Sequence, residues 1–122
     1  MTDREGGIGE QLAGWGKVAI LETRGRVTGQ PVRTAVGFAV ESGGSMVVAA
    51  SGPAVDWARN LLAHPACRVT IGNETDDYVA TEITGDEHTE AVVVLILKYG
   101  TPAERLGRGP AFRLRRRAEV PG

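Results

Sequence analysis

The sequence predicts a mainly β, α+β fold, a small antiparallel barrel of about six strands with two to three helices. Three observations support this prediction. Short apolar segments alternate with polar residues at period two or stay apolar on both faces, as strands do. Glycine-containing turns join several of these segments as hairpins. Only two segments place apolar residues at the spacing of an α-helix.

The chain has 122 residues, the size of one domain, and we expect residues 1–122 to form a single barrel domain. Its polar, glycine-rich start is expected to be loosely ordered, with a short helix over residues 8–15. Residues 17–23 are predicted to form the first strand. Residues 32–41 follow as the second strand. One face of this strand carries Val32, Thr34, Val36, Phe38 and Val40, and the opposite face carries Arg33, Ala35, Gly37 and Ala39.

A hairpin turn at residues 42–44 leads to a third strand, residues 45–51, whose apolar residues on both faces indicate a buried strand. Gly52-Pro53 ends this strand. Asp56 is placed to cap a helix that runs to about residue 63, and Pro65 stops that helix.

The rest of the chain contains one further hairpin, one longer helix and a last strand. The helix carries an apolar stripe. In the last strand apolar and charged residues alternate, so that one of its faces is expected to be exposed to solvent. These predicted elements are a strand at 67–71, a turn at Gly72-Asn73, a strand at 75–83, a helix at 86–99, a loop at 101–110 and a strand at 112–115.

Composition narrows the classes of function. The net charge of −1 gives no general attraction to nucleic acid or to a membrane surface, and few aromatic residues accompany the arginines of residues 113–117. The longest apolar run, residues 91–97, is too short to span a bilayer, and no leader is visible. The single cysteine, Cys67, fits a reducing compartment, and we expect a cytoplasmic protein. Two distant histidines and one cysteine predict no metal site.

The connection between the first two strands carries the clearest functional pattern. It places two glycines, a threonine hydroxyl and two arginines within nine residues, from Gly25 to Arg33. Glycine lets a backbone approach a ligand closely, and the guanidinium fork fits phosphate or carboxylate. We therefore expect Arg26, Thr28, Gly29 and Arg33 to form one cradle for an anion.

This loop and the segments that follow it resemble a known family. Residues 21–33, the strand at 47–51 and the helix segment at 57–65 resemble, in this order and spacing, the deazaflavin-dependent nitroreductase family of actinobacteria. That family is part of the flavin and deazaflavin oxidoreductase group. The likeness extends from about residue 17 to residue 83. It implies the split β-barrel fold of the pyridoxamine phosphate oxidases.

The resemblance also implies a cofactor and a reaction. The cofactor is coenzyme F420, whose phosphate and oligoglutamate tail are anionic and whose ring system is flat. The reaction is hydride transfer from the reduced deazaflavin to a small electrophile such as a quinone, a nitro compound or an activated alkene. By the resemblance, the tail is held by Arg26, Thr28, Gly29 and Arg33. The ring or its linker is faced by Ser51, Gly52, Trp57 and Asn60.

The chain departs from the family pattern at two places near the expected tail. Relatives often have a longer glycine-rich loop with a basic residue before Trp57, whereas here the only charge between Ser51 and Trp57 is that of Asp56. Val27 stands where a lysine is common. Each lost contact would weaken affinity by about 1–3 kcal/mol.

Two alternatives follow from these departures and from the family. The chain could hold a cofactor or ligand without turnover, as a carrier, or it could bind FMN instead of F420. Tyr99 is the one candidate for a proton donor, with bulk water as the other source. Split barrels of this group often pair into homodimers, and six strands with two modest covering helices are compatible with such pairing.

Overall fold

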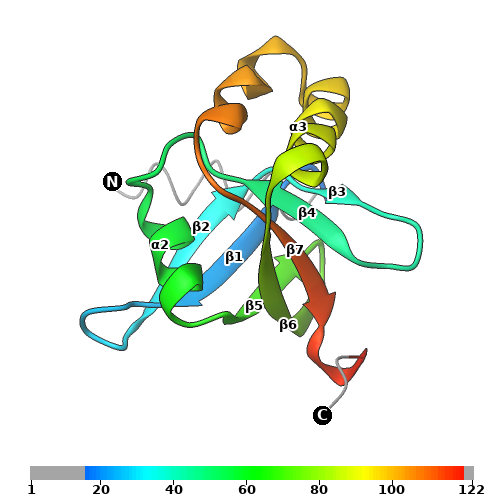
Figure 1. Cartoon of the computed structure of the whole chain (residues 1–122). Helices are drawn as coiled ribbons and strands as arrows, with labels where there is room; N and C mark the ends of the chain where they lie inside the picture. Colours follow the sequence, from blue (N-terminus) through cyan, green and yellow to red (C-terminus); the bar gives the residue numbers. More distant parts are fainter. Residues whose placement is uncertain (1–15, 120–122) are drawn as a thin grey trace, which may run out of the picture.

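Seven antiparallel strands form one curled sheet in the part of the chain that the structure describes, residues 16–119 of a computed structural model (Figure 1). The order across the sheet is β2-β1-β5-β6-β7-β4-β3. The strands are β1 (Ala19–Arg24), β2 (Pro31–Val36), β3 (Ala39–Val40), β4 (Met46–Ala49), β5 (Ala66–Ile71), β6 (Glu74–Ile83) and β7 (Ala111–Arg116). The curled, half-closed shape confirms the predicted split barrel.

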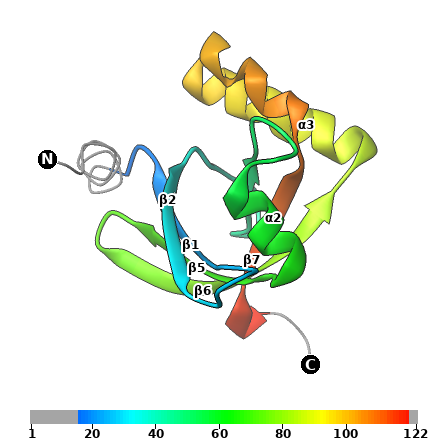
Figure 2. The ribbon, with the colours of Figure 1, turned by 90° about the vertical axis from the view of Figure 1, so that its left-hand side faces the viewer.

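The helices lie on two sides of this sheet (Figure 2). The short helix α2 (Asp56–Ala63) packs beside β1 and closes one end of the curl, whereas α3 (Gly85–Tyr99) packs outside against β3, β4 and β7. Two 3₁₀ segments follow, η1 (Thr101–Arg108) and η2 (Arg117–Glu119). The predicted helix at 8–15 lies outside the described residues.

The seventh strand arises because the predicted strand at 32–41 is interrupted at Gly37-Phe38. β2 pairs with β1, but β3 pairs with β4, so the chain turns a corner between the two. A Cβ at Gly37 would lie 3.0 Å from the Tyr99 ring, so a larger residue there would require the ring to shift. The Tyr99 hydroxyl donates to the Lys17 carbonyl oxygen at 2.7 Å and accepts from the Phe38 N–H at 3.1 Å.

Two local predictions are wrong. Asp56 does not cap α2, because Val55 occupies the N-cap position and Asp56 is the first helical residue, with its carboxylate turned to Arg26. The predicted loop at 101–110 forms η1 over most of its length, with a proline in its first turn and Leu106 packed under α3. The predicted turns at 42–44 and 72–73 are confirmed.

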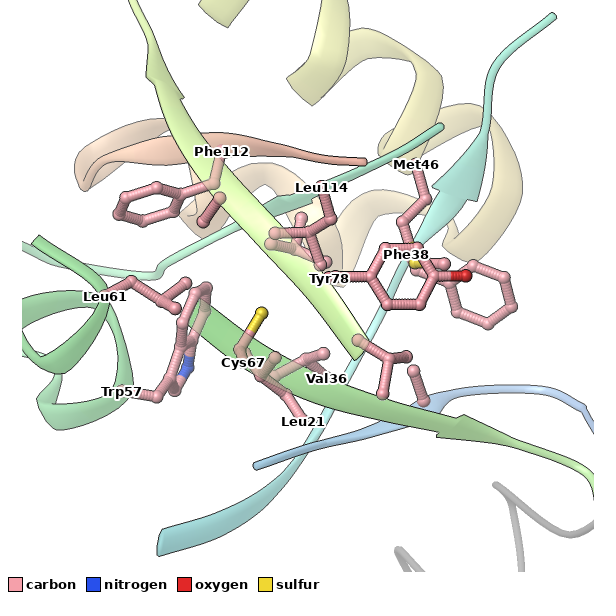
Figure 3. Close-up of a cluster of buried hydrophobic side chains, with 14 of the residues drawn as sticks. Leu21, Val36, Phe38, Met46, Trp57, Leu61, Cys67, Tyr78, Phe112 and Leu114 are labelled. Atoms are coloured by element: carbon pink, nitrogen blue, oxygen red, sulfur yellow. The ribbon is translucent and has the colours of Figure 1, made fainter. Parts of the chain in front are cut away.

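Two apolar cores explain why β4 is apolar on both faces. Met46, Val48 and Ala50 point into the curl, whereas Val47 and Ala49 lie under α3. Inside the curl, Trp57 and Leu61 of α2 lie at one end of the core (Figure 3). Phe38, Met46 and Tyr78 lie at the other end (Figure 3). Of the two fully buried residues of β7, Phe112 lies beside Trp57 and Leu61, and Leu114 lies between the two ends (Figure 3).

An ion-pair cluster joins β7, the turn before β4 and α3. Arg113 contacts Glu41 through two bonds, from Nε to Oε1 at 2.8 Å and from Nη2 to Oε2 at 3.0 Å. A third bond runs from Arg113 Nη1 to Glu87 Oε2 at 2.9 Å. The hydrogen bonds from Arg113 are the main reason that the pKa of Glu41 lies below its ordinary value of 4.5, and Ser45 adds a smaller lowering.

This cluster makes stability depend on pH in a defined direction. Folding lowers the pKa of Glu41. The stabilisation of the folded state by the Glu41 carboxylate is therefore complete above pH 4.5 and is lost as the pH falls through the folded-state pKa. Glu41→Gln is expected to lower the free energy of unfolding by about 1 kcal/mol at neutral pH and by much less at about pH 3. Urea denaturation at both pH values checks this. A variant of the exposed Glu90, Glu90→Gln, serves as control, and an equal effect of Glu41→Gln at both pH values would contradict the assignment.

Candidate functional site

The loop between β1 and β2 is closed tightly by its own backbone. The N–H of Gly25 donates to the Gln30 carbonyl oxygen at 2.8 Å, and the N–H of Gly29 donates to the Gly25 carbonyl oxygen at 2.8 Å. Gly29 has a φ of +76°, which favours glycine. The Thr28 hydroxyl accepts from the Gln30 N–H at 3.2 Å. Among the described residues nothing accepts from the N–H groups of Val27 and Thr28, so both are available to a ligand.

A buried amide fastens this loop to α2. Asn60, only 2% exposed, accepts from the Arg26 backbone N–H at 3.2 Å and from Arg26 Nη1 at 2.8 Å. Its Nδ2 group donates to the hydroxyl of Thr23, which is also buried, at 3.1 Å. Asn60 thus ties α2, β1 and the loop together and sets the direction of the Arg26 side chain.

Asp56 accepts hydrogen bonds from part of the Arg26 guanidinium group. Arg26 Nη2 lies 3.1 Å from Asp56 Oδ1, and Arg26 Nη1 donates to the Asp56 carbonyl oxygen at 3.4 Å. The Asp56 side chain is 78% exposed and that of Arg26 is 26% exposed. An anion that approaches Arg26 therefore meets an exposed carboxylate that competes for the same donors.

Arg33 lies in β2, whereas Arg26 lies in the loop and contacts Asn60 of α2. Glu22 pairs with Arg33 and Thr23 pairs with Val32. Directly opposed residues share a face of the sheet, and successive residues alternate. Because Thr23 faces α2, Glu22 and Arg33 face the outside of the curl. The alternation around Val32 places Arg33 on this outer face, and joint binding of one anion by the two arginines stays a prediction.

On that outer face, Gly29 borders a second arginine-rich surface. A cavity of about 250 Å³ is lined by three arginines, Arg24, Arg68 and Arg117, with two carboxylates among its other lining residues. One of these carboxylates, Asp77, pairs with Arg68 at 3.2 Å. A Cβ at Gly29 would lie 3.9 Å from Arg24 Nε, so Arg24 lies beside the loop. These arginines are far apart in the sequence and come together only because β1 pairs with β5, β5 pairs with β6, and β6 pairs with β7, which Arg117 follows.

Trp57 is placed in the core. It is 7% exposed and packs against Phe112, with ring centroids 6.0 Å apart. Ser51 is exposed at the start of the loop that leads from β4 to α2. The next residue, Gly52, lies against Gly109, where a Cβ would come within 2.5 Å of the Gly52 carbonyl oxygen. Ser51 and Gly52 are therefore held by backbone packing rather than by a hydrogen bond to the Arg26 cluster.

The other candidate reactive side chains, Tyr99 and Cys67, have structural roles. Tyr99 shares its hydroxyl with the backbone of Lys17 and Phe38, at the corner between β2 and β3. Burial raises the pKa of the Cys67 thiol to about 12, with a smaller contribution from Asp77, so this cysteine is not a nucleophile. Within residues 16–119 no group of three or more His, Cys, Asp or Glu residues could hold a metal ion. No helix in that range is both long enough and apolar enough to cross a membrane.

A protein-family model shows to which family this chain belongs. The model of the F420H2-dependent quinone reductases matches residues 1–105 of this chain. The chain belongs to the F420H2-dependent quinone reductase family. This membership confirms the resemblance to deazaflavin-dependent enzymes, and the protein is an oxidoreductase of the F420H2-dependent class.

Several solved structures share the fold of this chain. The F420-H2 dependent reductase FDR-A is 22% identical, with a TM-score of 0.67 over 81% of this chain and 94% of its own. A domain-swapped dimer is 21% identical, with a TM-score of 0.67 over 87% and 92% of the two chains. HutZ, the heme storage protein from Vibrio cholerae, is 20% identical, with a TM-score of 0.70 over 98% and 93%. At these identities the likeness establishes the split-barrel fold alone.

Proposed function

We propose that this protein transfers a hydride from reduced coenzyme F420 to a quinone-type acceptor. The family supports the coenzyme and the reductase activity, and its description supports a quinone rather than a nitro compound or an activated alkene. Neither the family nor the related structures lend support to FMN. The observation that carries the proposal is the Arg26 loop, in which buried Asn60 holds a guanidinium beside two available N–H groups.

The donor set of this loop fits the anionic end of the coenzyme. The Arg26 guanidinium supplies charge, the N–H groups of Val27 and Thr28 supply neutral donors, and Gly29 keeps the backbone accessible. Asn60 prevents Arg26 from swinging into solvent, so little side-chain entropy remains to be lost on binding. Arg33 is not part of this set, because it lies on the outer face of the hairpin beside Glu22.

The bound deazaflavin supplies the hydride, and the protein's part is to hold, orient and shield it. Ser51 and Gly52 stay candidates for contacts with the ring, because their loop precedes α2 directly and is braced by Gly109. Trp57 supports this region from inside the core, and we do not assign it a ring contact. Because the Tyr99 hydroxyl already serves the backbone, we assign the proton for the reduced acceptor to bulk water.

A homodimer and a cytoplasmic location are further parts of the proposal. A structure with the same fold is a domain-swapped dimer, which makes pairing of two copies a reasonable expectation. Sedimentation of the purified protein as a stable monomer would contradict the dimer.

Two measurements test the proposed function. Titration of the purified protein with F420 is expected to give a saturable change in coenzyme fluorescence. Addition of menadione to the protein with reduced F420 is expected to accelerate coenzyme oxidation above the rate without protein. Saturable binding without acceleration would support a carrier instead. The absence of saturable binding would refute both functions, and a yellow protein on purification would indicate FMN.

Removal of the carboxylate beside Arg26 is expected to tighten coenzyme binding. Asp56→Asn retains the side-chain shape but removes the charge that competes for Arg26 and repels an anionic tail. Because the side chain is well exposed, we expect a modest decrease in the F420 dissociation constant, about two- to five-fold. Fluorescence titration at low and high salt checks this, since added salt should shrink the difference. Unchanged affinity at low salt would place the tail away from Arg26.

A further inference from the structure

The end of the curl opposite α2 contains a separate cavity. Along β7, Arg116 lies four residues beyond Phe112, which packs on Trp57 at the α2 end. The cavity at the Arg116 end measures about 240 Å³. Its wall includes the apolar side chains of Val40, Met46, Val69 and Ile71, and the phenol of Tyr78 completes it.

The hydroxyl of Tyr78 has no partner in the described chain. The residue is 4% exposed, yet no hydrogen bond to its oxygen occurs within residues 16–119. Every fully buried side-chain nitrogen or oxygen in that range does have a partner, so the Tyr78 oxygen must reach solvent. The opening that Tyr78 lines is this cavity, and its hydroxyl points away from Trp57 and Leu61 (Figure 3).

The charged side chains that line the cavity carry a net negative charge, which disfavours an anionic ligand. Glu74, Asp76 and Arg116 line the cavity, and the two carboxylates exceed the single guanidinium by one negative charge. Arg116 Nη2 lies 3.9 Å from Asp76 Oδ2, so part of its charge is already compensated. An apolar wall with one inward hydrogen-bond donor suits a neutral molecule that carries a carbonyl group. The volume is below the usual range for drug-sized ligands, which limits the ligand to one or two rings.

We propose that this cavity is a second binding site, which takes a neutral one- or two-ring carbonyl compound whose oxygen accepts a hydrogen bond from Tyr78. It is distinct from the Arg26 loop, because the inward residues of β1 and β5 separate the two ends of the curl. The inference does not rest on the proposed function, since binding here requires no coenzyme.

Methionine methyl NMR tests the site directly. The chain has two methionines, and Met46 lines the cavity, so its methyl signal, assigned with the variant Met46→Leu, reports on occupancy. We expect 1-tetralone, a neutral two-ring ketone, to shift the Met46 signal saturably. Tetralin has the same rings without the carbonyl group and is expected to bind about five- to ten-fold more weakly.

Tyr78→Phe separates the hydrogen bond from the shape of the cavity. Because the hydroxyl bonds nothing in the described chain, this variant is expected to fold with unchanged thermal stability. It should bind 1-tetralone as weakly as tetralin, with tetralin affinity unchanged. Equal affinity of the wild type and the variant for 1-tetralone would overturn the proposal.

Two tryptophan substitutions at exposed positions complete the test. Val40→Trp at the lip of the cavity is expected to abolish binding of both probes, because Val40 is 63% exposed and faces the mouth. Leu62→Trp on α2, at 53% exposure, is the matched control and should leave binding unchanged. A Met46 signal that 1-tetralone does not move up to its solubility limit would show that the cavity holds only water.

Discussion

Asn60→Ala is expected to lower the free energy of unfolding by about 2–4 kcal/mol. The side chain is almost fully buried and makes three hydrogen bonds, two with Arg26 and one with Thr23. Its loss leaves the buried Thr23 hydroxyl and the Arg26 backbone N–H without partners, and each unpaired group costs about 1–3 kcal/mol. Coenzyme affinity should fall as well, because Arg26 then loses the contact that orients it.

Urea denaturation and F420 titration of the same variants measure both effects. Thr23→Val is the matched control, because it removes one bond of the network and leaves the Arg26 contacts in place. We expect it to lower stability by about 1–2 kcal/mol with little change in coenzyme affinity. If Asn60→Ala and Thr23→Val had equal effects on stability, the bonds between Asn60 and Arg26 would contribute nothing.

Arg26→Gln is expected to raise the F420 dissociation constant about ten- to a hundred-fold, whereas Arg33→Gln should change it less than about two-fold. The two residues come from one sequence motif and undergo the same chemical change. They differ in position, because Arg26 faces α2 and Arg33 shares the outer face with Glu22. Comparison of the two variants therefore tests whether F420 affinity depends on where the arginine lies or only on its positive charge.

Fluorescence titration at fixed ionic strength measures both variants, and a urea denaturation curve of Arg26→Gln shows how much of its effect is structural. The glutamine amide can still donate to Asn60, so most of the fold should be retained. Equal losses in the two variants would mean that the tail crosses the hairpin. A loss in Arg33→Gln alone would place the tail on the outer face beside Arg24.

Much of the barrel could be predicted from local sequence. Glycine-containing turns at 42–44 and 72–73 and the double-sided apolar pattern of β4 led to the correct strands. The break between β2 and β3 could not be predicted in this way. It depends on the ring of Tyr99, which comes from α3 about sixty residues later and occupies the space beside Gly37. The same contact gives Tyr99 a structural role that its position in the sequence does not reveal.

In the candidate site, too, some features could be predicted from the sequence and others only from the structure. Its loop was visible in the sequence, because glycine, threonine and arginine carry their chemistry wherever they stand. Which donors face together was not visible. Asn60 and Asp56 reach Arg26 from thirty or more residues away, and Arg24, Arg68 and Arg117 meet only through strand pairing.

From the sequence alone came the fold class, the family and the loop that carries the anion-binding chemistry, because these follow from side-chain periodicity and from a compact motif. Only the tertiary structure decided that Arg26 and Arg33 lie on opposite faces and that Tyr78 presents an unpaired hydroxyl to a cavity. The physical reason is that alternation along a strand and closure of the sheet determine the neighbours of each side chain, and both depend on contacts between distant parts of the chain.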